Sequence, residues 1–194
     1  MKYTSSSKAG TGKTNEDAIL VIQPSLEEIV AMVCDGMGGL DFPEIASEIM
    51  ATSVKDVFSA GIRDNVPEQI HSAFALATEE LTKESARRGA RLGCAVGIVV
   101  IKAKVMWYSS IGNVRIYLTE SDITKRLLTQ DDVYTDENGI SYLTNCIKGN
   151  GSIPDIQVMK LTLPEHYIVE TCSDGYYESN PIDDSSIVSI LQTD

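Results

Sequence analysis

The stretch EIVAMVCDGMGG, Glu28 to Gly39, sets an apolar run directly before an Asp and a glycine-rich turn. The run is short and rich in β-branched residues, which predicts a buried β-strand. DAILVIQ, Asp17 to Gln23, has the same character, and the turn residues Pro24 and Ser25 separate the two runs. The sequence therefore predicts a strand pair that ends at Asp35, in a turn where glycines let a ligand approach the backbone.

The hydrophobic period changes after this turn. Residues 43–61 and 67–89 both open on Pro-Glu, carry apolar side chains at helical spacing and end at glycine, so each predicts an amphipathic helix. After Gly89 the apolar runs are short and strand-like almost to the end of the chain. Two long helices inserted into such a series predict an α+β fold, in which the helices flank a sandwich of mainly antiparallel strands.

Length and charge limit the possible functions. A chain of 194 residues predicts a single domain spanning 1–194. The 16 Lys and Arg residues stand against 28 Asp and Glu, which gives a net charge of −12 without a basic stripe. This balance argues against nucleic acid as a partner and favours divalent cations. No apolar run reaches the roughly 18 residues of a membrane span and no leader precedes the fold, so we expect a cytoplasmic protein.

The four cysteines are widely spaced and form no C-x-x-C pair. They are Cys34, Cys94, Cys146 and Cys172. Most of them adjoin apolar strand-like runs, where cysteine behaves as a small hydrophobic residue. We therefore expect reduced core thiols and no metal or redox role.

The segment SKAGTGKTNED, Ser7 to Asp17, admits two interpretations. A phosphate-binding loop needs a glycine five residues before Gly-Lys-Thr and a helix after it, but Ser7 occupies the glycine position and a strand-like run follows. The nucleotide-binding interpretation therefore fails. The informative residues are the carboxylates Glu16 and Asp17.

Further carboxylates occur in matching places. CSDG, Cys172 to Gly175, again places an Asp, Asp174, between a strand-like run and a glycine, and Asp183 and Asp184 precede the last apolar run. Carboxylates gathered at strand ends are the ligands that Mg²⁺ and Mn²⁺ prefer. Each Asp by itself is also a common turn residue, so the prediction rests on the set.

Several motifs in this order resemble the metal-dependent serine/threonine phosphatases of the protein phosphatase 2C family, bacterial branch. They are TNEDA, VCDGMGG, SSIGNVRIYL, LLTQDD, LTNCIKG and CSDG. The resemblance runs from about Gly10 to the end of the chain. It implies a β-sandwich flanked by helices, with two divalent cations, Mn²⁺ or Mg²⁺, at one end of the sandwich.

The resemblance also assigns roles to single residues. It implies that Asp35 bridges both cations, that Gly36 offers its carbonyl to one, and that Asp174 and Asp183 hold the other. The alignment of the last motif leaves Asp184 open as an alternative ligand. Glu16 and Asp17 would hold metal-bound waters. Two such cations lower the pKa of a shared water and neutralise phosphoryl oxygens during in-line attack.

The chain also departs from the family pattern. Asn113 stands where the family has an Asp that helps to hold a third cation, so we expect that third site to be weak or absent. Gly12 occupies the position of a phosphate-binding Arg, and the neighbouring Lys13 is the candidate substitute. Between Thr129 and Leu143 there is no room for the family's helical flap, which predicts an open site. The short link from Asp174 to Asp183 predicts a hairpin-like connection in place of a helical segment.

The sequence therefore predicts a hydrolase that removes phosphate from phosphoserine or phosphothreonine in a phosphoprotein and opposes a kinase. Two alternatives stay open. One is a regulatory or binding module that keeps the fold with weak or no catalysis, which the changes at Gly12 and Asn113 make plausible. The other is a phosphatase of the partner-switching, sporulation-regulator type, which shares the fold and shortens the flap.

Overall fold

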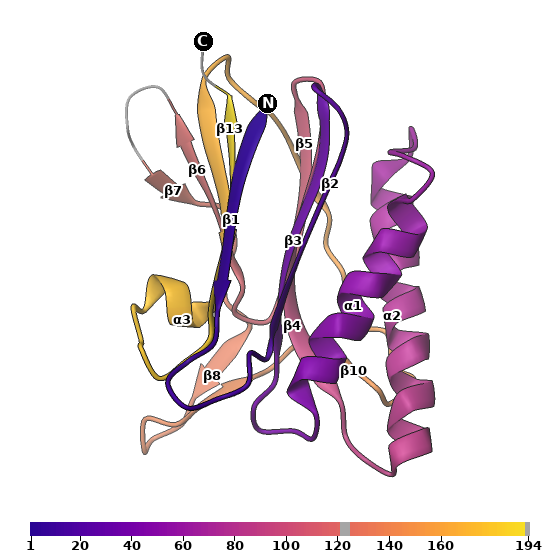
Figure 1. The fold of residues 1–194 in the computed structure, drawn as a ribbon, viewed down its shortest axis with the longest axis vertical. Coiled ribbons are helices and arrows are strands. Elements are labelled where there is room, and N and C mark those ends of the chain that lie inside the picture. Colours follow the sequence, from indigo (N-terminus) through magenta and orange to yellow (C-terminus); the bar gives the residue numbers. More distant parts are fainter. Residues whose placement is uncertain (121–124, 193–194) are drawn as a thin grey trace.

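The computed structural model describes residues 1–120 and 125–192 and arranges them in three layers (Figure 1). Two β-sheets pack face to face, and two long helices cover the outer face of one sheet. The outer face of the second sheet carries, among the described residues, only the short helix α3 near one end. The α+β sandwich with two long helices is confirmed.

The helix-covered sheet has the strand order β11-β5-β4-β3-β2, with β10 paired to β4. Its strands are antiparallel and comprise β2 (Asp17–Ser25), β3 (Glu28–Gly36), β4 (Gly93–Lys102), β5 (Val105–Ile111), β10 (Ile147–Lys148) and β11 (Met159–Thr162). The predicted strands 17–23 and 28–36 correspond to β2 and β3. β3 and β4 are buried along most of their length because the helices cover one face and the second sheet covers the other.

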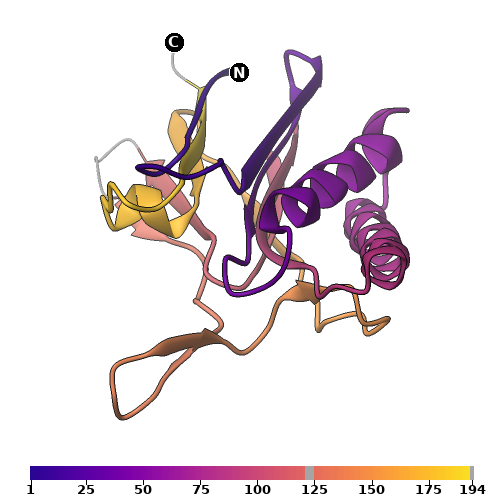
Figure 2. The ribbon, with the colours of Figure 1, turned by 60° about the horizontal axis from the view of Figure 1, so that its bottom comes forward.

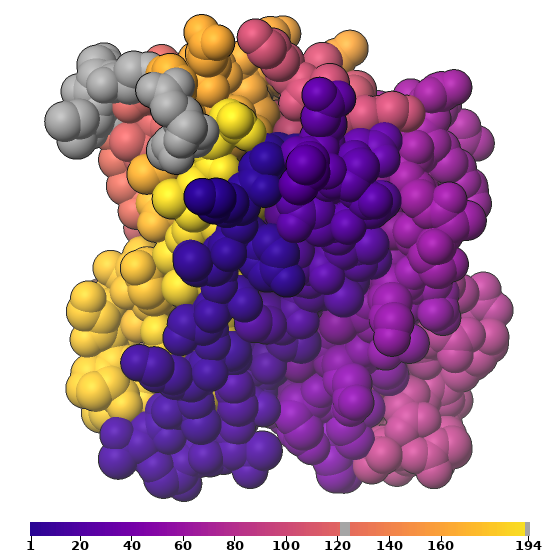
Figure 3. Space-filling view, turned by 45° about the horizontal axis from the view of Figure 1, so that its top comes forward, coloured from indigo at the N-terminus to yellow at the C-terminus, as the bar shows by residue number. Residues whose placement is uncertain are grey.

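The second sheet has the order β1-β13-β12-β6-β7. It comprises β1 (Lys2–Lys8), β6 (Arg115–Glu120), β7 (Lys125–Leu127), β12 (Tyr167–Cys172) and β13 (Ser185–Gln192). The first and last strands, β1 and β13, pair antiparallel and lie side by side (Figure 3). The sequence patterns gave no sign of β1, because this edge strand is mostly exposed and KYTSSSK has no apolar face.

The helices α1 (Pro43–Phe58) and α2 (Val66–Arg88) confirm the two predicted helices, and their ends differ by a few residues. Asn65 caps α2 by accepting a hydrogen bond from the Glu68 amide, and Gly89 ends it in the left-handed conformation at φ 64°. α1 lacks a side-chain cap. Phe42 precedes it at φ 51°, and its ring lies 4.7 Å from the Arg88 guanidinium of α2.

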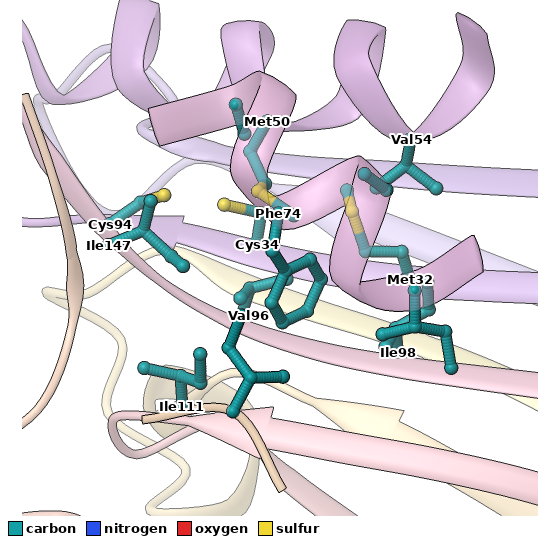
Figure 4. Close-up of a cluster of buried hydrophobic side chains, with 14 of the residues drawn as sticks. Met32, Cys34, Met50, Val54, Phe74, Cys94, Val96, Ile98, Ile111 and Ile147 are labelled. Atoms are coloured by element: carbon teal, nitrogen blue, oxygen red, sulfur yellow. The ribbon is translucent and has the colours of Figure 1, made fainter. Parts of the chain in front are cut away.

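The core between the helices and their sheet fixes the end of β3. Figure 4 shows Met50 of α1 and Phe74 of α2 packed against Met32 and Cys34 of β3, and all four are fully buried. Each such side chain stabilises the fold by about 1.5–3 kcal/mol. All four cysteines are buried free thiols, as expected. Because this packing holds β3 rigidly, the turn that follows Asp35 starts from a fixed point.

Two short elements lie at the same end of the sandwich. β8 (Val133–Thr135) and β9 (Ser141–Leu143) form a separate hairpin that projects from the molecule (Figure 2). The link from β12 to β13 joins adjacent antiparallel strands, so the predicted hairpin-like connection is confirmed, and it contains the short helix α3 (Asp174–Tyr177), which was not predicted. One helical turn forms there, with the amides of Tyr176 and Tyr177 bonded to the Ser173 carbonyl. In the described ranges, no helix combines the length and the apolar character that crossing a membrane needs.

Candidate metal centre and phosphatase site

Strand register brings the first two carboxylates together. Asp17 at the start of β2 lies directly opposite Asp35 at the end of β3, and side chains in opposite positions have Cβ atoms about 4.5–5.5 Å apart. The Ser173 hydroxyl donates to Oδ2 of Asp17 at 2.8 Å, whereas its Oδ1 is buried without a partner. Because an unpaired buried acceptor is costly, this atom marks a place where a donor or a cation belongs.

The turn after Asp35 needs glycine because other backbone segments approach it closely. A Cβ on Gly36 would lie 2.1 Å from the carbonyl oxygen of Pro43, at the start of α1. The Gly36 amide donates to the Glu16 carbonyl at 3.2 Å, and the Met37 amide donates to the Gly93 carbonyl at 3.0 Å. These contacts bring the segment that carries Glu16 against the Asp35 turn.

Asp174 and Asp183 come from the second sheet. Asp174 is the first residue of α3, directly after β12, and Asp183 lies two residues before β13. Gly175 allows the two segments to meet, because a Cβ there would lie 3.1 Å from the Asp183 Cβ and 2.1 Å from the Asp184 carbonyl oxygen. The ends of both sheets therefore contribute carboxylates to one place.

Glu16, Asp35, Asp174 and Asp183 line one cavity of about 650 Å³ at the end of the sandwich, whereas the buried Asp17 lies outside its lining. Its charged lining residues are Lys13, Glu16, Asp35, Asp174 and Asp183. The glycine turn forms part of the wall, and so do Asn113 and residues Ser141–Leu143 of the β8–β9 hairpin. The structure thus brings together most of the residues predicted from the sequence, and among the described residues Lys13 is the one cation in the lining.

The carboxylates raise one another's pKa values. Burial raises the pKa of Asp35 well above its usual range, and the charges of Asp17, Asp174 and Asp183 raise it further. Burial is also the main cause that raises the pKa of Asp17 to about 6 and that raises the pKa of Asp174. Burial and the nearby Asp184 charge also raise the pKa of Glu16. Such a concentration of negative charge favours a bound cation.

Asp184 differs from Asp183 in its burial and in its hydrogen bonds. Its side chain is 3% exposed, and its two carboxylate oxygens accept hydrogen bonds from the Gly10 and Glu16 amides, each at 2.6 Å. It does not line the cavity, whereas Asp183 does. Asp183 uses one oxygen, Oδ1, to accept the Asp184 amide at 3.0 Å. Asp184 therefore holds the segment between β1 and β2 against the start of β13. This segment carries Lys13 and Glu16.

The residues present fit divalent cations in kind, since four carboxylates and the backbone of Gly36 line the cavity. The buried Asp17, opposite Asp35, keeps one oxygen without a partner. As they are placed, no three His, Cys, Asp or Glu side chains of residues 1–120 and 125–192 form a ready ligand group. Asp174 is turned to accept the Asn113 amide at 2.7 Å, and Asp17 is turned to Ser173. Both hydrogen bonds are accepted by Oδ2, so Oδ1 of each carboxylate makes neither of them.

The segment between Thr129 and Leu143, where the family has a helical flap, contributes to the site in this protein. Residues 133–143 form the β8–β9 hairpin, and Ser141, Tyr142 and Leu143 lie in the cavity wall. No helix forms between Thr129 and Leu143, as expected, and the unpredicted hairpin gives the site a short, two-stranded wall on this side. Tyr134 and Tyr142 face each other across the hairpin and are 60% and 51% exposed. The turn residues Asn138 and Gly139, between two short runs that each contain a tyrosine, were the signal that could have predicted it.

Clustered carboxylates that can hold two divalent cations occur in metal-dependent phosphatases, polymerases, nucleases and aminopeptidases. The sequence profile of protein phosphatase 2C matches residues 5–192, so the chain belongs to that family, which supports a protein serine/threonine phosphatase. No curated protein sequence matches the chain significantly.

Solved structures of bacterial phosphatases share the fold. PppA, described as a key regulatory component of T6SS in Pseudomonas aeruginosa, superposes with a TM-score of 0.82 at 16% identity and covers 98% of this chain and 96% of its own. Stp1 from Staphylococcus aureus, a serine/threonine phosphatase, gives 0.80 at 16% identity over 100% and 95%. The catalytic domain of PstP, in complex with two manganese ions, gives 0.79 at 16% identity over 99% and 98%. At these identities the likeness shows the fold.

Proposed function

We propose that the protein hydrolyses phosphoserine or phosphothreonine in a phosphoprotein, with two divalent cations, Mn²⁺ or Mg²⁺, as cofactors. The observation that carries the proposal is the convergence of Asp35, Asp174, Asp183 and Glu16 with Lys13 on one cavity. Family membership and the two manganese ions of the PstP domain support it. A phosphoprotein and an opposing kinase would be its partners.

The residues of the site divide into two roles. Asp35, the Gly36 carbonyl, Asp174 and Asp183 would hold the cations, which activate water and neutralise phosphoryl oxygens when bound. Glu16 and Asp17 would orient metal-bound waters, and the unpaired Oδ1 of Asp17 supports this role. We therefore place Asp183, and not Asp184, among the cation ligands, because both oxygens of Asp184 are used by backbone amides.

Lys13 would bind the phosphoryl group. Its side chain lies in the cavity wall, where the remaining charged lining residues are acidic. An ammonium group holds phosphate as a point charge and lacks the paired donors of Arg, so we expect weaker binding of small phosphate esters than an Arg would give.

Hydrolysis of para-nitrophenyl phosphate and of a phosphothreonine peptide tests the proposal. Turnover should need added Mn²⁺ and should be abolished by chelator and by Asp35→Asn, while the exposed α1 substitution Asp56→Asn leaves it unchanged. Turnover that survives chelation, or that survives Asp35→Asn, would contradict the metal mechanism.

A second pair of substitutions separates the two adjacent acids. Asp183→Asn should weaken Mn²⁺ binding in calorimetry with little loss of stability. Asp184→Asn should instead destabilise the fold by about 1–3 kcal/mol, because its amide would face a backbone N–H donor. The reverse pattern would make Asp184 the ligand.

A second candidate function is a binding module with weak or no catalysis. The observation that favours it is that no three His, Cys, Asp or Glu side chains of residues 1–120 and 125–192 are placed as a ready ligand group. Mn²⁺ binding without turnover on either ester would support this module over the phosphatase.

A further inference from the structure

α3 contacts the loop between β5 and β6 at two points. Asp174, at the start of α3, accepts a hydrogen bond from the Asn113 side-chain amide at 2.7 Å. Tyr177, the last residue of the same helical turn, donates its hydroxyl to the Asn113 backbone carbonyl at 3.0 Å. One residue of the loop is thus bound through its side chain and through its backbone by the two ends of α3.

The ring of Tyr177 is itself held in place. The Arg115 guanidinium lies 3.8 Å from the ring centroid, and Arg115 also donates to both oxygens of Asp131, at 2.7 Å to Oδ2 and 3.1 Å to Oδ1. Paired Arg–carboxylate contacts fix the plane of the guanidinium, and a cation over an aromatic face stabilises the stack. Tyr177 is therefore bound on its face and at its hydroxyl.

The other side of the loop is also restrained. Gly112 has φ 90°, and its amide donates to Asp132 Oδ2 at 3.0 Å. A Cβ on Gly112 would lie 2.6 Å from the Ala95 Cβ on β4. Since the loop is bound on both sides, the backbone position of Asn113 is fixed, and the hydrogen bond to Asp174 sets the direction of its side-chain amide.

This geometry has a consequence for Asp174. An amide on Oδ2 restricts the rotation of the carboxylate and leaves Oδ1 for another ligand in the cavity. A neutral amide does so without adding a charge to the carboxylate cluster. Groups that orient a ligating carboxylate in this way commonly change metal affinity or activity by about 10–100-fold.

We propose that Tyr177 is a positioning residue that, through Asn113, orients the Asp174 carboxylate toward the cation site. The chain of contacts runs from Asp131 through Arg115 and Tyr177 to Asn113 and Asp174. The inference rests on the proposed function only in taking Asp174 as a cation ligand.

Tyr177→Phe tests the inference, because it removes the hydroxyl and keeps the ring for Arg115. Tyr176→Phe, on the next residue, is the matched control, since Tyr176 is 40% exposed. Mn²⁺ binding by calorimetry should be about fivefold weaker in Tyr177→Phe, as expected for the loss of one hydrogen bond, and unchanged in Tyr176→Phe. Urea unfolding of metal-free samples checks that both variants keep the parent stability within about 1 kcal/mol.

A double-substitution cycle tests the route through Asn113. Asn113→Ala should weaken Mn²⁺ binding by about tenfold, and Tyr177→Phe should then have no further effect. Additive losses would contradict a route through the Asn113 amide.

NMR of the metal-free protein gives a readout that needs neither cation nor turnover. The side-chain amide resonances of Asn113 should shift in Tyr177→Phe and stay unchanged in Tyr176→Phe. Unchanged resonances, or equal Mn²⁺ affinity of the parent and Tyr177→Phe, would overturn the inference while the phosphatase proposal stands. If the parent protein binds no Mn²⁺, the proposed function fails, and the amide resonances alone decide whether Tyr177 positions Asn113.

Discussion

The buried carboxyl of Asp17 should make the metal-free protein less stable as the pH rises. Burial is the main cause that raises its pKa from 3.8 to about 6. A carboxyl whose pKa is higher in the folded state keeps its proton longer there, so the free energy of unfolding falls as the pH rises through this window. At about 1.4 kcal/mol per pKa unit, the displacement corresponds to about 3 kcal/mol. This contribution is fully present below a pH of about 4 and is lost above about 6.

Asp17→Asn removes the titrating group and keeps an oxygen that accepts from Ser173. We expect equal stability of variant and parent near pH 4, and a variant more stable by about 3 kcal/mol near pH 7. Urea unfolding in the presence of chelator measures both. Because the Asp17 charge also raises the pKa of Asp35, the measured difference includes this coupling as well as the titration of Asp17 itself. The exposed substitution Asp56→Asn should show no such divergence. Parallel stability curves over this range, or a less stable variant at neutral pH, would refute the reasoning.

Three further substitutions have expected outcomes. Gly36→Ala should destabilise the fold by about 1–3 kcal/mol or more in urea unfolding, because its Cβ would meet a backbone carbonyl oxygen at 2.1 Å, whereas Gly39→Ala, with nothing within 4 Å, should change little. Lys13→Gln should raise the KM for para-nitrophenyl phosphate by about tenfold in steady-state kinetics, and an equal effect of Lys8→Gln would show that the charge acts only at long range. Tyr142→Ala should raise the KM for a phosphothreonine peptide more than for the small ester, since the hairpin wall reaches beyond the phosphoryl group.

The elements with a strong apolar pattern were predictable from the sequence. Short apolar runs mark β2 and β3, and apolar residues at helical spacing mark both long helices. The turn after Asp35 was predictable because a glycine-rich segment follows the apolar run of β3. β1 was missed because an edge strand buries too little of its surface to show a pattern. Tertiary pairing with β13, at the far end of the chain, is what makes it a strand.

Some residues of the site could likewise be predicted from local sequence, whereas others depend on contacts between distant positions. Asp35 and Asp174 follow apolar strands, so a local signal marks both. The contact between Asn113 and Asp174 joins positions 61 residues apart, and no local pattern indicates it. The choice between Asp183 and Asp184 likewise depends on which backbone amides lie nearby, and the amides of Gly10 and Glu16 come from the other end of the chain.

The carboxylates that the proposed function needs lower the stability of the metal-free fold. Asp35, Asp17 and Asp174 all have pKa values raised chiefly by burial, so their ionised forms oppose folding in the absence of a cation. A ligand that binds only the folded state adds stability in proportion to the logarithm of its concentration, about 2.7 kcal/mol at about one hundred times Kd. Cation binding and folding are therefore coupled at this end of the sandwich. The fully buried core between the helices and β3 lies beside the cluster, and it keeps the strand ends in register whether or not the carboxylates are neutralised.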